Sequence, residues 1–309
     1  MRIRPIKDTI IFVNRTCLRF AVRTNLRLFH WIPNHLLFFY VHRRLPDRER
    51  LNIKDLAFFN KYDTASIALG PFVDKETAKA FVRSIAPEVR VPKTFRVLRS
   101  REELRDLDLD SPYVAKPTHG SGVVVFKPEG GSLTPEELAT LGRGLATNYY
   151  LAGGEIQYRY LEKKIIAEEF VGDPPRIPSD WKVHCYEGRL LFCTVILDRY
   201  GDSKNLKLDR DGTRLPISIS SPWLETTGTV YEGPFDLPDN YAQIVAAAEK
   251  LSAPFRYCRI DLFTHQGEVY FGEITFSPGN CLFVMNPENV SDVRTWLGST
   301  PSPAAASTR

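Results

Sequence analysis

Residues 255–280 constrain the fold more than any other stretch of this chain. Their sequence, FRYCRIDLFTHQGEVYFGEITFSPGN, contains two alternating runs of strand-forming residues, Tyr257–Phe263 and Glu268–Phe276. The four residues THQG between the runs are typical of a turn, so the pattern predicts a β-hairpin. Because side chains alternate faces along a strand, Arg259 and Asp261 share one face.

The second strand of this hairpin carries a carboxylate that can meet the first. Alternation gives one face of the second strand the residues Val269, Phe271, Glu273 and Thr275. With an odd loop count and Gly267 in the left-handed position of a bulged turn, Asp261 and Glu273 lie side by side among apolar residues. Two such carboxylates repel unless a cation lies between them, and Mg²⁺ binds hard oxygen ligands, often together with substrate phosphates. The alternative is a surface hairpin with scattered acids.

Composition places the chain among ordinary soluble globular proteins. Its 309 residues suit two modest domains or one larger domain with lobes, and 43% are hydrophobic and 25% charged. The five cysteines form no CxxC and are odd in number. We therefore expect free thiols packed in cores, and a cytoplasmic protein.

The positive charge is concentrated near the N-terminus. Residues 1–60 hold twelve Lys and Arg against four Asp and Glu, a net charge of +8, which leaves −4 for the rest of this +4 chain. Arginines interrupt the apolar run of residues 10–20, so no signal peptide is predicted, and residues 28–41 are too short to span a bilayer. Arginine with Trp and Phe suits the surface of an anionic membrane. Packing onto the main domain is the alternative, and nucleic acid fits poorly because no known motif is present.

Residues 54–70 and 74–86 are predicted helices. In the second, Asp74 is expected as the cap, with Lys75 and Lys79 exposed to solvent. A later helix is predicted over Tyr241–Leu251, and residues 299–309 are expected to be a disordered tail.

A glycine-rich hairpin is predicted over residues 113–127. The strand Tyr113–Lys116 is followed by PTHGSG and by a second strand, Val123–Lys127. Backbone N–H groups and hydroxyls in such a turn can cover phosphates, and Lys116 at the strand end could reach one. Neither GxxxxGK[ST] nor GxGxxG occurs, so the chain has no P-loop and no Rossmann fingerprint.

Three further segments complete the predicted organisation. Residues 164–171 form a buried strand that ends in Glu168 and Glu169, and the proline-rich residues 173–179 are a candidate hinge between lobes. Residues 181–197 form another hairpin, which carries Lys182.

The order of these parts resembles the ATP-grasp superfamily, and more closely its TupA-like branch, named for teichuronopeptide biosynthesis. The resemblance runs from about Arg43 to Asn280. It is carried by FNKYD, VDKETAKAFV, AKPTHGSG, TNYY, IQYRY, KIIAEEFVG, DWKVHCYEGR and RIDLFTHQGEVYFGEITFSPG.

The resemblance implies an α+β fold in which two α+β lobes with antiparallel sheets clamp ATP, here with a basic helical N-terminal segment added. The expected divisions are an N-terminal arm (1–45), a lead-in segment (46–110), the first lobe (111–172), the second lobe with the metal-binding hairpin (173–290) and a C-terminal tail (291–309).

It also implies roles for single residues. ATP is expected to contact Lys116, His119, Gly120, Ser121, Gly122, Glu168, Glu169 and Lys182, with the two glutamates at the adenine and ribose end. The expected metal ligands are Asp261, Glu273 and Thr275; many ATP-grasp enzymes have Asn where this chain has Thr275. Arg259 and Lys182 are the expected catalytic residues, and the substrate loop contains Ser277, Gly279 and Asn280.

The resulting hypothesis is an ATP- and Mg²⁺-dependent ligase that joins a carboxylate to an amine through an acyl phosphate, in polysaccharide or glycoconjugate assembly for the cell envelope. Three alternatives remain. The first is an ATP-grasp kinase that phosphorylates a hydroxyl. The second is a metal-dependent glycosyltransferase whose DxD-like motif is Asp106, Asp108 and Asp110. The third is a non-enzymatic binding protein that acts through its basic arm.

Overall fold

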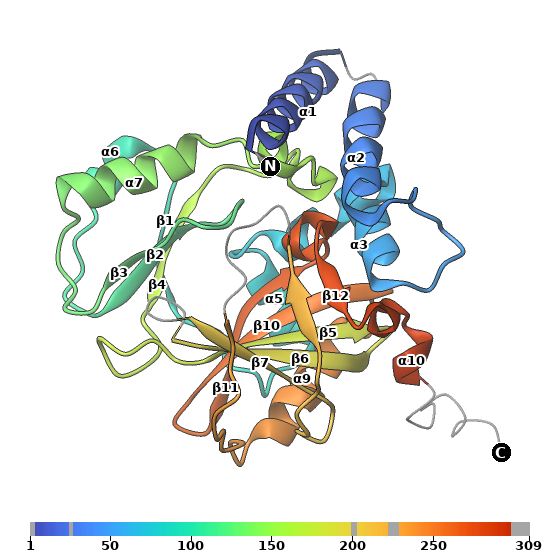
Figure 1. The fold of residues 1–309 in the computed structure, drawn as a ribbon. Coiled ribbons are helices and arrows are strands. Elements are labelled where there is room, and N and C mark those ends of the chain that lie inside the picture. The colour runs from blue at the N-terminus through green and yellow to red at the C-terminus, as the bar shows by residue number, and fades with distance from the viewer. Residues whose placement is uncertain (1–3, 25–26, 199–202, 222–228, 298–309) are drawn as a thin grey trace.

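The computed structural model describes residues 4–24, 27–198, 203–221 and 229–297, and confirms the α+β fold class (Figure 1). Two sheets dominate it. The smaller has the strand order β1-β4-β2-β3, and the larger has the order β11-β10-β5-β6-β7-β9. A two-stranded ribbon, β8 (Ser218–Ser220) with β12 (Val284–Asn286), packs beside the larger sheet.

The smaller sheet is antiparallel throughout. Its strands are β1 (Thr94–Leu98), β2 (Tyr113–Pro117), β3 (Val125–Lys127) and β4 (Ile165–Glu169). Helices α6 (Arg101–Arg105) and α7 (Pro135–Ala146) cover one face and share its apolar core (Figure 1). Because β1 comes from the expected lead-in segment, the first sheet begins well before residue 111.

The larger sheet forms the centre of the molecule. Its strands are β5 (Asp180–Tyr186), β6 (Arg189–Leu197), β7 (Lys204–Leu208), β9 (Thr229–Val230), β10 (Tyr257–His265) and β11 (Glu268–Thr275). All described pairs are antiparallel except β7 with β9 at the edge. Helices α5 (Ala78–Ile85) and α9 (Tyr241–Ser252) fill one face, and α3 (Ile53–Tyr62) contributes to the core of the other.

The lead-in segment is more broken than its sequence predicts. The helix expected over 54–70 ends at Tyr62 and is followed by a 3₁₀ helix, η1 (Thr64–Leu69), and by α4 (Gly70–Val73). Asp74 accepts hydrogen bonds from the backbone of Glu76 and Thr77, both at 3.0 Å, so it caps the turn before α5 and not the helix itself.

The N-terminal segment forms two helices, α1 (Arg4–Thr24) and α2 (Arg27–His42), which pack against each other at one end of the molecule (Figure 1). The inner side of α2 packs onto the main domain: Phe38 meets Phe58 with ring centroids 5.0 Å apart, and His42 Nε2 lies 2.7 Å from the carbonyl oxygen of Cys281. This confirms the packing alternative for the inner side. No helix in the described ranges is long and apolar enough to cross a membrane.

The C-terminal tail begins later than expected. Residues 288–291 form η4 (Glu288–Ser291), and α10 (Arg294–Leu297) follows. Val293 is fully buried and its backbone N–H donates to the carbonyl of Leu51 at 2.8 Å, so the chain is still anchored there. The expected disorder of residues 299–309 falls outside the described residues. All five cysteines are free thiols, and four are buried, as predicted.

Candidate functional site

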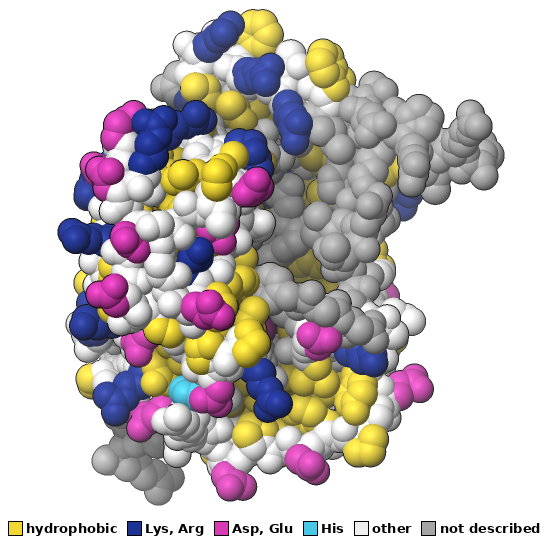
Figure 2. All heavy atoms as spheres, turned by 90° about the vertical axis from the view of Figure 1, so that its left-hand side faces the viewer, with side chains coloured by type: hydrophobic (Ala, Val, Ile, Leu, Met, Phe, Trp, Pro, Cys, Tyr) yellow, Lys and Arg dark blue, Asp and Glu magenta, His cyan; other side chains and the backbone are white. Residues whose placement is uncertain are grey.

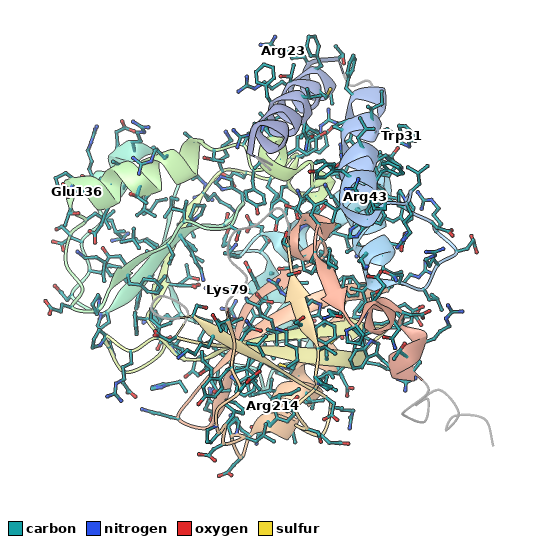
Figure 3. All side chains as sticks on the ribbon, viewed as in Figure 1. Arg23, Trp31, Arg43, Lys79, Glu136 and Arg214 are labelled. Atoms are coloured by element: carbon teal, nitrogen blue, oxygen red, sulfur yellow. The ribbon has the colours of Figure 1, made fainter. Side chains whose placement is uncertain are left out.

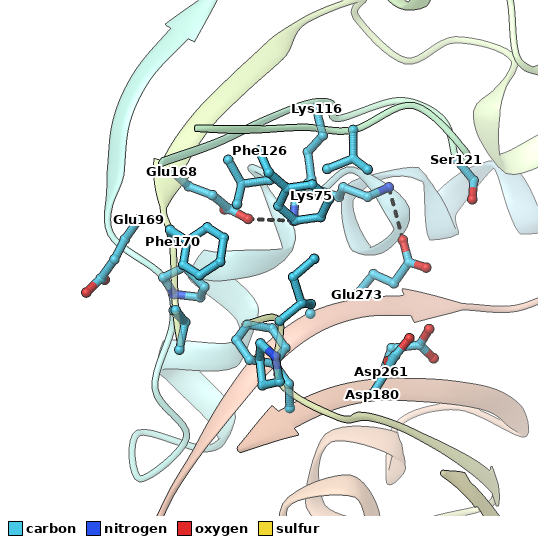
Figure 4. Close-up of a pocket in the computed structure, with 18 of the residues that line it drawn as sticks. Lys75, Lys116, Ser121, Phe126, Glu168, Glu169, Phe170, Asp180, Asp261 and Glu273 are labelled. Carbon is cyan, nitrogen blue, oxygen red and sulfur yellow. Dashed lines mark ion pairs between the residues drawn. The ribbon is translucent and has the colours of Figure 1, made fainter. Parts of the chain in front are cut away.

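A cavity of about 290 Å³ lies between the two sheets (Figure 4). Strands β2, β3 and β4 and the glycine-rich turn form one wall, and β10 and β11 form the other. The lining residues are Lys75, Pro92, Val114, Lys116, Gly120, Ser121, Gly122, Val123, Val124, Phe126, Glu168, Glu169, Phe170, Val171, Ile177, Pro178, Asp180, Asp261, Phe263, Gly272 and Glu273.

The hairpin register brings the two predicted carboxylates together. Asp261 pairs directly with Glu273 across β10 and β11. The predicted cause of this pairing, a bulged turn with an odd number of loop residues, was wrong. The turn has only two residues, Gln266 and Gly267, with φ of 50° and 79°. A bulge at Gly272 shifts the register instead.

The bulge also separates the faces of β11. Val269 and Phe271, 5% and 1% exposed, point into the apolar core and not to the side of Glu273 as predicted. A Cβ at Gly272 would lie 2.9 Å from the carbonyl oxygen of Asp261, so glycine is required at this close approach.

Cations, not apolar side chains, surround the two carboxylates. Asp261 accepts from Arg259 Nε and from Lys182 Nζ, both at 2.6 Å, and Lys182 also pairs with Asp180 at 2.9 Å. Glu273 pairs with Lys75 at 3.0 Å and with Arg259 at 3.8 Å. Three cations thus balance three carboxylates, and we name this group the large-sheet cluster: Lys75, Lys182, Arg259, Asp180, Asp261 and Glu273.

This balance keeps Glu273 ionised. Burial raises the pKa of its carboxyl, but Lys75, Lys182 and Arg259 outweigh burial and hold the pKa well below the ordinary value. Burial likewise lowers the pKa of Arg259, and the charge of Asp261 more than restores it. The guanidinium is therefore a permanent cation beside the cavity.

Lys75 links the large-sheet cluster to the glycine-rich turn. The prediction that Lys75 is exposed was wrong: the residue is 9% exposed, and its Nζ donates to the carbonyl oxygen of Gly120 at 2.6 Å as well as pairing with Glu273. Gly122 has a φ of 84°, which favours glycine, and Gly120, Ser121 and Gly122 all line the cavity, as the sequence predicted.

A second ion cluster lies on the smaller sheet. Glu168 is 5% exposed, and its carboxylate pairs with Lys116 Nζ at 2.5 Å (Figure 4) and with Lys79 Nζ at 2.6 Å. Lys79, also predicted to be exposed, is buried between the lobes and donates in addition to Pro92 O and Thr94 Oγ1, each at 2.9 Å (Figure 3). We name Glu168, Lys79 and Lys116 the small-sheet cluster.

The other end of the cavity is apolar. Phe170 lies there, away from Asp261 and Glu273 (Figure 4), and its ring meets that of Phe126 edge to face with centroids 6.1 Å apart. The other large apolar residues of the cavity lining include Val114, Ile177 and Phe263. An apolar slot with backbone groups at its edge suits a flat aromatic ring, while the charged end suits an anion.

Comparison with known families agrees with this geometry. The family model described as TupA-like ATPgrasp matches residues 54–300. The chain belongs to the TupA-like ATP-grasp family. No curated protein matches the sequence.

Solved structures resemble this family member only distantly. D-alanine–D-alanine ligase from Bacillus anthracis is 16% identical with a TM-score of 0.40, and the match covers 73% of this chain and 60% of that one. The ATP-grasp ligase PsnB, complexed with a phosphomimetic precursor variant, Mg and ADP, is 13% identical with a TM-score of 0.38, covering 72% and 57%. The match thus spans about three fifths of the length of these proteins.

Several predicted site residues of this TupA-like chain lie outside the cavity lining. His119 is 3% exposed and accepts from the backbone N–H of Lys164 at 3.2 Å. Thr275 Oγ1 accepts from Arg259 at 3.3 Å. Ser277 is 2% exposed and donates to Glu155 at 2.6 Å, while Gly279 and Asn280 both adopt left-handed φ in η3 (Pro278–Cys281).

The DxD-like motif lies outside the cavity lining. Asp106, Asp108 and Asp110 are exposed after α6 and none lines the cavity. Within the described part of the chain, no three His, Cys, Asp or Glu residues are grouped so that they could hold a metal by themselves. A metal held by two carboxylates therefore needs ligands from a substrate or water.

Sequence reasoning missed Lys75, Lys79 and Asp180. The two lysines stand four residues apart, and Val82 follows at the next position of the same helical stripe. Since Val82 is fully buried, that spacing placed both lysines on the inward side of the segment. Two lysines in line with a buried valine were the sequence feature that could have predicted their burial.

Proposed function

We propose that this TupA-like chain is an ATP-dependent ligase that joins a carboxylate to an amine. One observation carries the proposal: Asp261 and Glu273 stand opposite each other, among three cations, at the charged end of a cavity whose other end is apolar. A nucleoside triphosphate has the same polarity, with a flat base at one end and an anionic chain at the other. Family membership supports the choice of ATP.

In this proposal the base lies against Phe126, Phe170 and Ile177, and Glu169 at the exposed lip is near the ribose. The phosphates lie toward Lys116, Lys75 and the turn Gly120–Gly122. Glu168 is engaged by two lysines, so its role is to hold Lys116 and Lys79 in place.

The large-sheet cluster fits Mg²⁺. Asp261 and Glu273 would hold the ion, with nucleotide phosphates as further ligands, because they stand opposite each other at the cavity and Mg²⁺ commonly takes one or two carboxylates. The lysines and the arginine now paired with them can turn to phosphate oxygens when a nucleotide is present. When bound, Mg²⁺ neutralises phosphate charge and so eases transfer of the phosphoryl group.

The proposed reaction has two steps. A substrate carboxylate oxygen bonds to the γ-phosphorus, the bond to the bridging oxygen breaks, and ADP leaves with that electron pair. The amine nitrogen then bonds to the acyl carbon, phosphate leaves, and the amine loses a proton. Arg259 on β10 and Lys182 on β5 would stabilise negative charge on the transferring group, because both donate to Asp261, which lines the cavity.

A coupled assay tests this proposal. Purified protein with ATP and Mg²⁺ should release ADP only when both a carboxylate and an amine are present. Uronic acids and uronate-containing oligosaccharides are the first carboxylates to try, with amino acids and amino sugars as amines, because the resemblance to teichuronopeptide enzymes points to polysaccharide modification. Hydroxylamine should replace the amine and give a hydroxamate, which reports the acyl phosphate.

The kinase alternative predicts a different result. ADP release with a sugar that has hydroxyls but no carboxylate, and a stable phosphorylated product, would favour a kinase. Loss of ATP binding when Mg²⁺ is removed by chelation is expected for both, so only the acceptor requirement separates them.

A further inference from the structure

The outer side of the α1–α2 hairpin is an apolar surface without a described partner. Large hydrophobic side chains are exposed on both helices, with Leu36 at 57%, Phe39 at 49% and Phe12 at 71%. Figure 1 shows both helices at one end of the molecule, so their outer side can approach a flat surface before either lobe does.

These side chains follow helical spacing. Ile32, Leu36 and Phe39 recur at intervals of four and three, which places them along one stripe of α2, and Arg43 follows just after the end of the helix. The opposite stripe contains Leu37 and Phe38, which are buried against the main domain. Since α2 already buries one complete apolar face, this second face is not needed for the fold.

Arginines form a matching stripe on α1. Arg15, Arg19 and Arg23 recur every four residues and all are exposed. Residues 1–45 contain nine Lys and Arg against one acid, a net charge of +8, whereas residues 46–60 contain three of each. Six of these nine basic residues and the one acid lie in α1 and α2, so the two helices carry a net charge of +5. In Figure 2, basic and hydrophobic side chains adjoin at the top of the molecule.

A groove of about 330 Å³ runs between the two helices. Val13 and Asn14 line it from α1, Leu36 and Phe39 line it from α2, and Arg43 lines it just after the end of α2. Asn14 is 7% exposed, and its Oδ1 has no hydrogen-bond partner among the described residues. The groove thus offers an apolar slot with one unsatisfied polar acceptor inside and one cation at its edge.

We propose that this face docks on the surface of an anionic phospholipid bilayer. Part of an acyl chain would occupy the groove, the glycerol or headgroup donor would meet Asn14, and Arg43 would pair with the phosphate. Helices with arginines beside Trp and Phe lie in the membrane interface in this way, with their apolar side chains among the first acyl carbons. A second copy of this chain fits less well, because two faces of the same strong positive charge repel.

Vesicle co-sedimentation of the full chain tests the charge. Binding is expected with vesicles of equal parts phosphatidylglycerol and phosphatidylcholine, and not with phosphatidylcholine alone, and salt should weaken it. Each basic side chain at such a surface is worth roughly a fivefold change in partition. Replacing Arg15, Arg19 and Arg23 by Gln should therefore reduce binding about a hundredfold. The matched control replaces Arg96, Arg101 and Arg143, exposed arginines of the first lobe, and should bind as the parent does.

Two double variants, in which exposed apolar residues are replaced by Ser, test whether the groove contacts the bilayer. Leu36→Ser with Phe39→Ser should lower binding about tenfold, since apolar contact with the acyl region is lost. Val230→Ser with Leu237→Ser, at 45% and 39% exposure in the second lobe, is the control and should not change it. Thermal unfolding of each variant checks that the fold is kept, because all four positions are exposed.

Trp31 is 42% exposed on α2, so its fluorescence reports directly how deeply this helix enters the bilayer. Anionic vesicles should shift its emission to the blue, brominated acyl chains should quench it, and Trp31→Phe should remove both changes. Binding that is unaffected by either set of variants would overturn the proposal. So would a dimer in lipid-free solution that becomes monomeric in the Leu36/Phe39 variant, because the face would then belong to a second copy.

Discussion

Two buried ion clusters face each other across the cavity, and they differ in charge. The small-sheet cluster holds two lysines against Glu168 alone, whereas the large-sheet cluster holds three cations against three carboxylates. Buried charges are costly unless they are paired, so both arrangements need a reason beyond stability. An excess of positive charge suits a permanent anion site. A balanced cluster can exchange its own cations for a metal ion that arrives with phosphates.

One segment ties the two clusters together. Lys75 in the turn before α5 and Lys79 in the first turn of that helix are only four residues apart, yet the first pairs with Glu273 on the larger sheet and the second with Glu168 on the smaller. The segment before α5 therefore sets the distance between the two walls of the cavity. The comparison predicts that changes in the large-sheet cluster impair chemistry, while changes in the small-sheet cluster impair binding and stability.

Glu273→Gln should have the largest effect. The change keeps the size and removes one charge from the metal-binding pair, so turnover of ATP should fall on the order of a hundredfold or more. Glu168→Gln should leave turnover at saturating ATP within about fivefold, because that carboxylate holds lysines and no metal. ADP release measured for both variants makes the comparison.

The stability of Glu273→Gln is a second test of the large-sheet cluster. Repulsion between two carboxylates alone would make the variant more stable, but three cations already surround them, so we expect the nucleotide-free variant to be less stable. Mg²⁺ with ADP should raise the melting temperature of the parent more than that of the variant. Full activity of Glu273→Gln would exclude this residue as a metal ligand.

Lys79→Met should mainly lower stability, whereas Lys75→Met should mainly impair ATP binding. Lys79 makes three contacts, to Glu168, Pro92 O and Thr94 Oγ1, and its loss should lower the free energy of unfolding by about 2–4 kcal/mol. Lys75→Met should cost less stability, about 1–2 kcal/mol, but should raise the KM for ATP several-fold because the turn at Gly120 loses its anchor. Urea unfolding and steady-state kinetics on the same preparations separate the two, and identical profiles would show that the clusters act as one.

Lys116→Met should weaken ATP binding about tenfold through loss of a charge beside the phosphates. Its side chain is 20% exposed, so the fold should survive, although Glu168 keeps only Lys79 as its partner. The double variant Lys116→Met with Glu168→Gln should be less stable than Lys116→Met, because Lys79 is then buried without its carboxylate, and it should not recover affinity. Titration with a fluorescent ADP analogue and thermal unfolding measure both. Affinity within twofold of the parent would make Lys116 a purely structural partner of Glu168.

The chemistry-bearing residues of local hairpins were predictable from sequence. Asp261 and Glu273 could be paired because both lie within one hairpin, where alternation and a short turn limit the register. The glycine-rich turn, in which Gly122 has a φ of 84°, was an equally local signal. The wrong mechanism for the register, a bulged turn instead of a bulge at Gly272, shows that turn chemistry alone does not fix where a ladder breaks.

What sequence could not supply was contact between distant segments. Lys75 and Glu273 are far apart in the chain, and they meet because α4 and α5, on either side of Lys75, both pack on β11. Lysine in a predicted helix is ordinarily exposed, so the local sequence predicted exposure. Ion pairs with distant carboxylates instead keep both lysines buried. The same holds for Ser277, whose hydroxyl is taken up by Glu155 instead of facing the cavity.

The smallest expected effect is on the response of stability to acid. Burial raises the pKa of both glutamates, but the lysines beside Glu168, and the lysines and arginine near Glu273, hold both pKa values below the ordinary 4.5. In the unfolded chain these carboxylates protonate as the pH falls through about 4.5, while in the folded protein they stay ionised. The unfolded state then binds more protons, so stability present above pH 4.5 is lost progressively below it, by at most about 1.4 kcal/mol per pH unit for each glutamate.

Replacing either glutamate by Gln should therefore flatten the loss of stability below about pH 4.5. The flattening is expected for both variants, because the lysines beside Glu168, and the lysines and arginine near Glu273, hold the pKa of each carboxyl below its ordinary value. Urea unfolding across the acid range measures the slope, with Glu136→Gln, an exposed position on α7, as the control for loss of one negative charge. Equal slopes for all three variants would mean that the two clusters do not hold their carboxylates ionised, and the contrast between a balanced and a cation-rich cluster would lose its electrostatic basis.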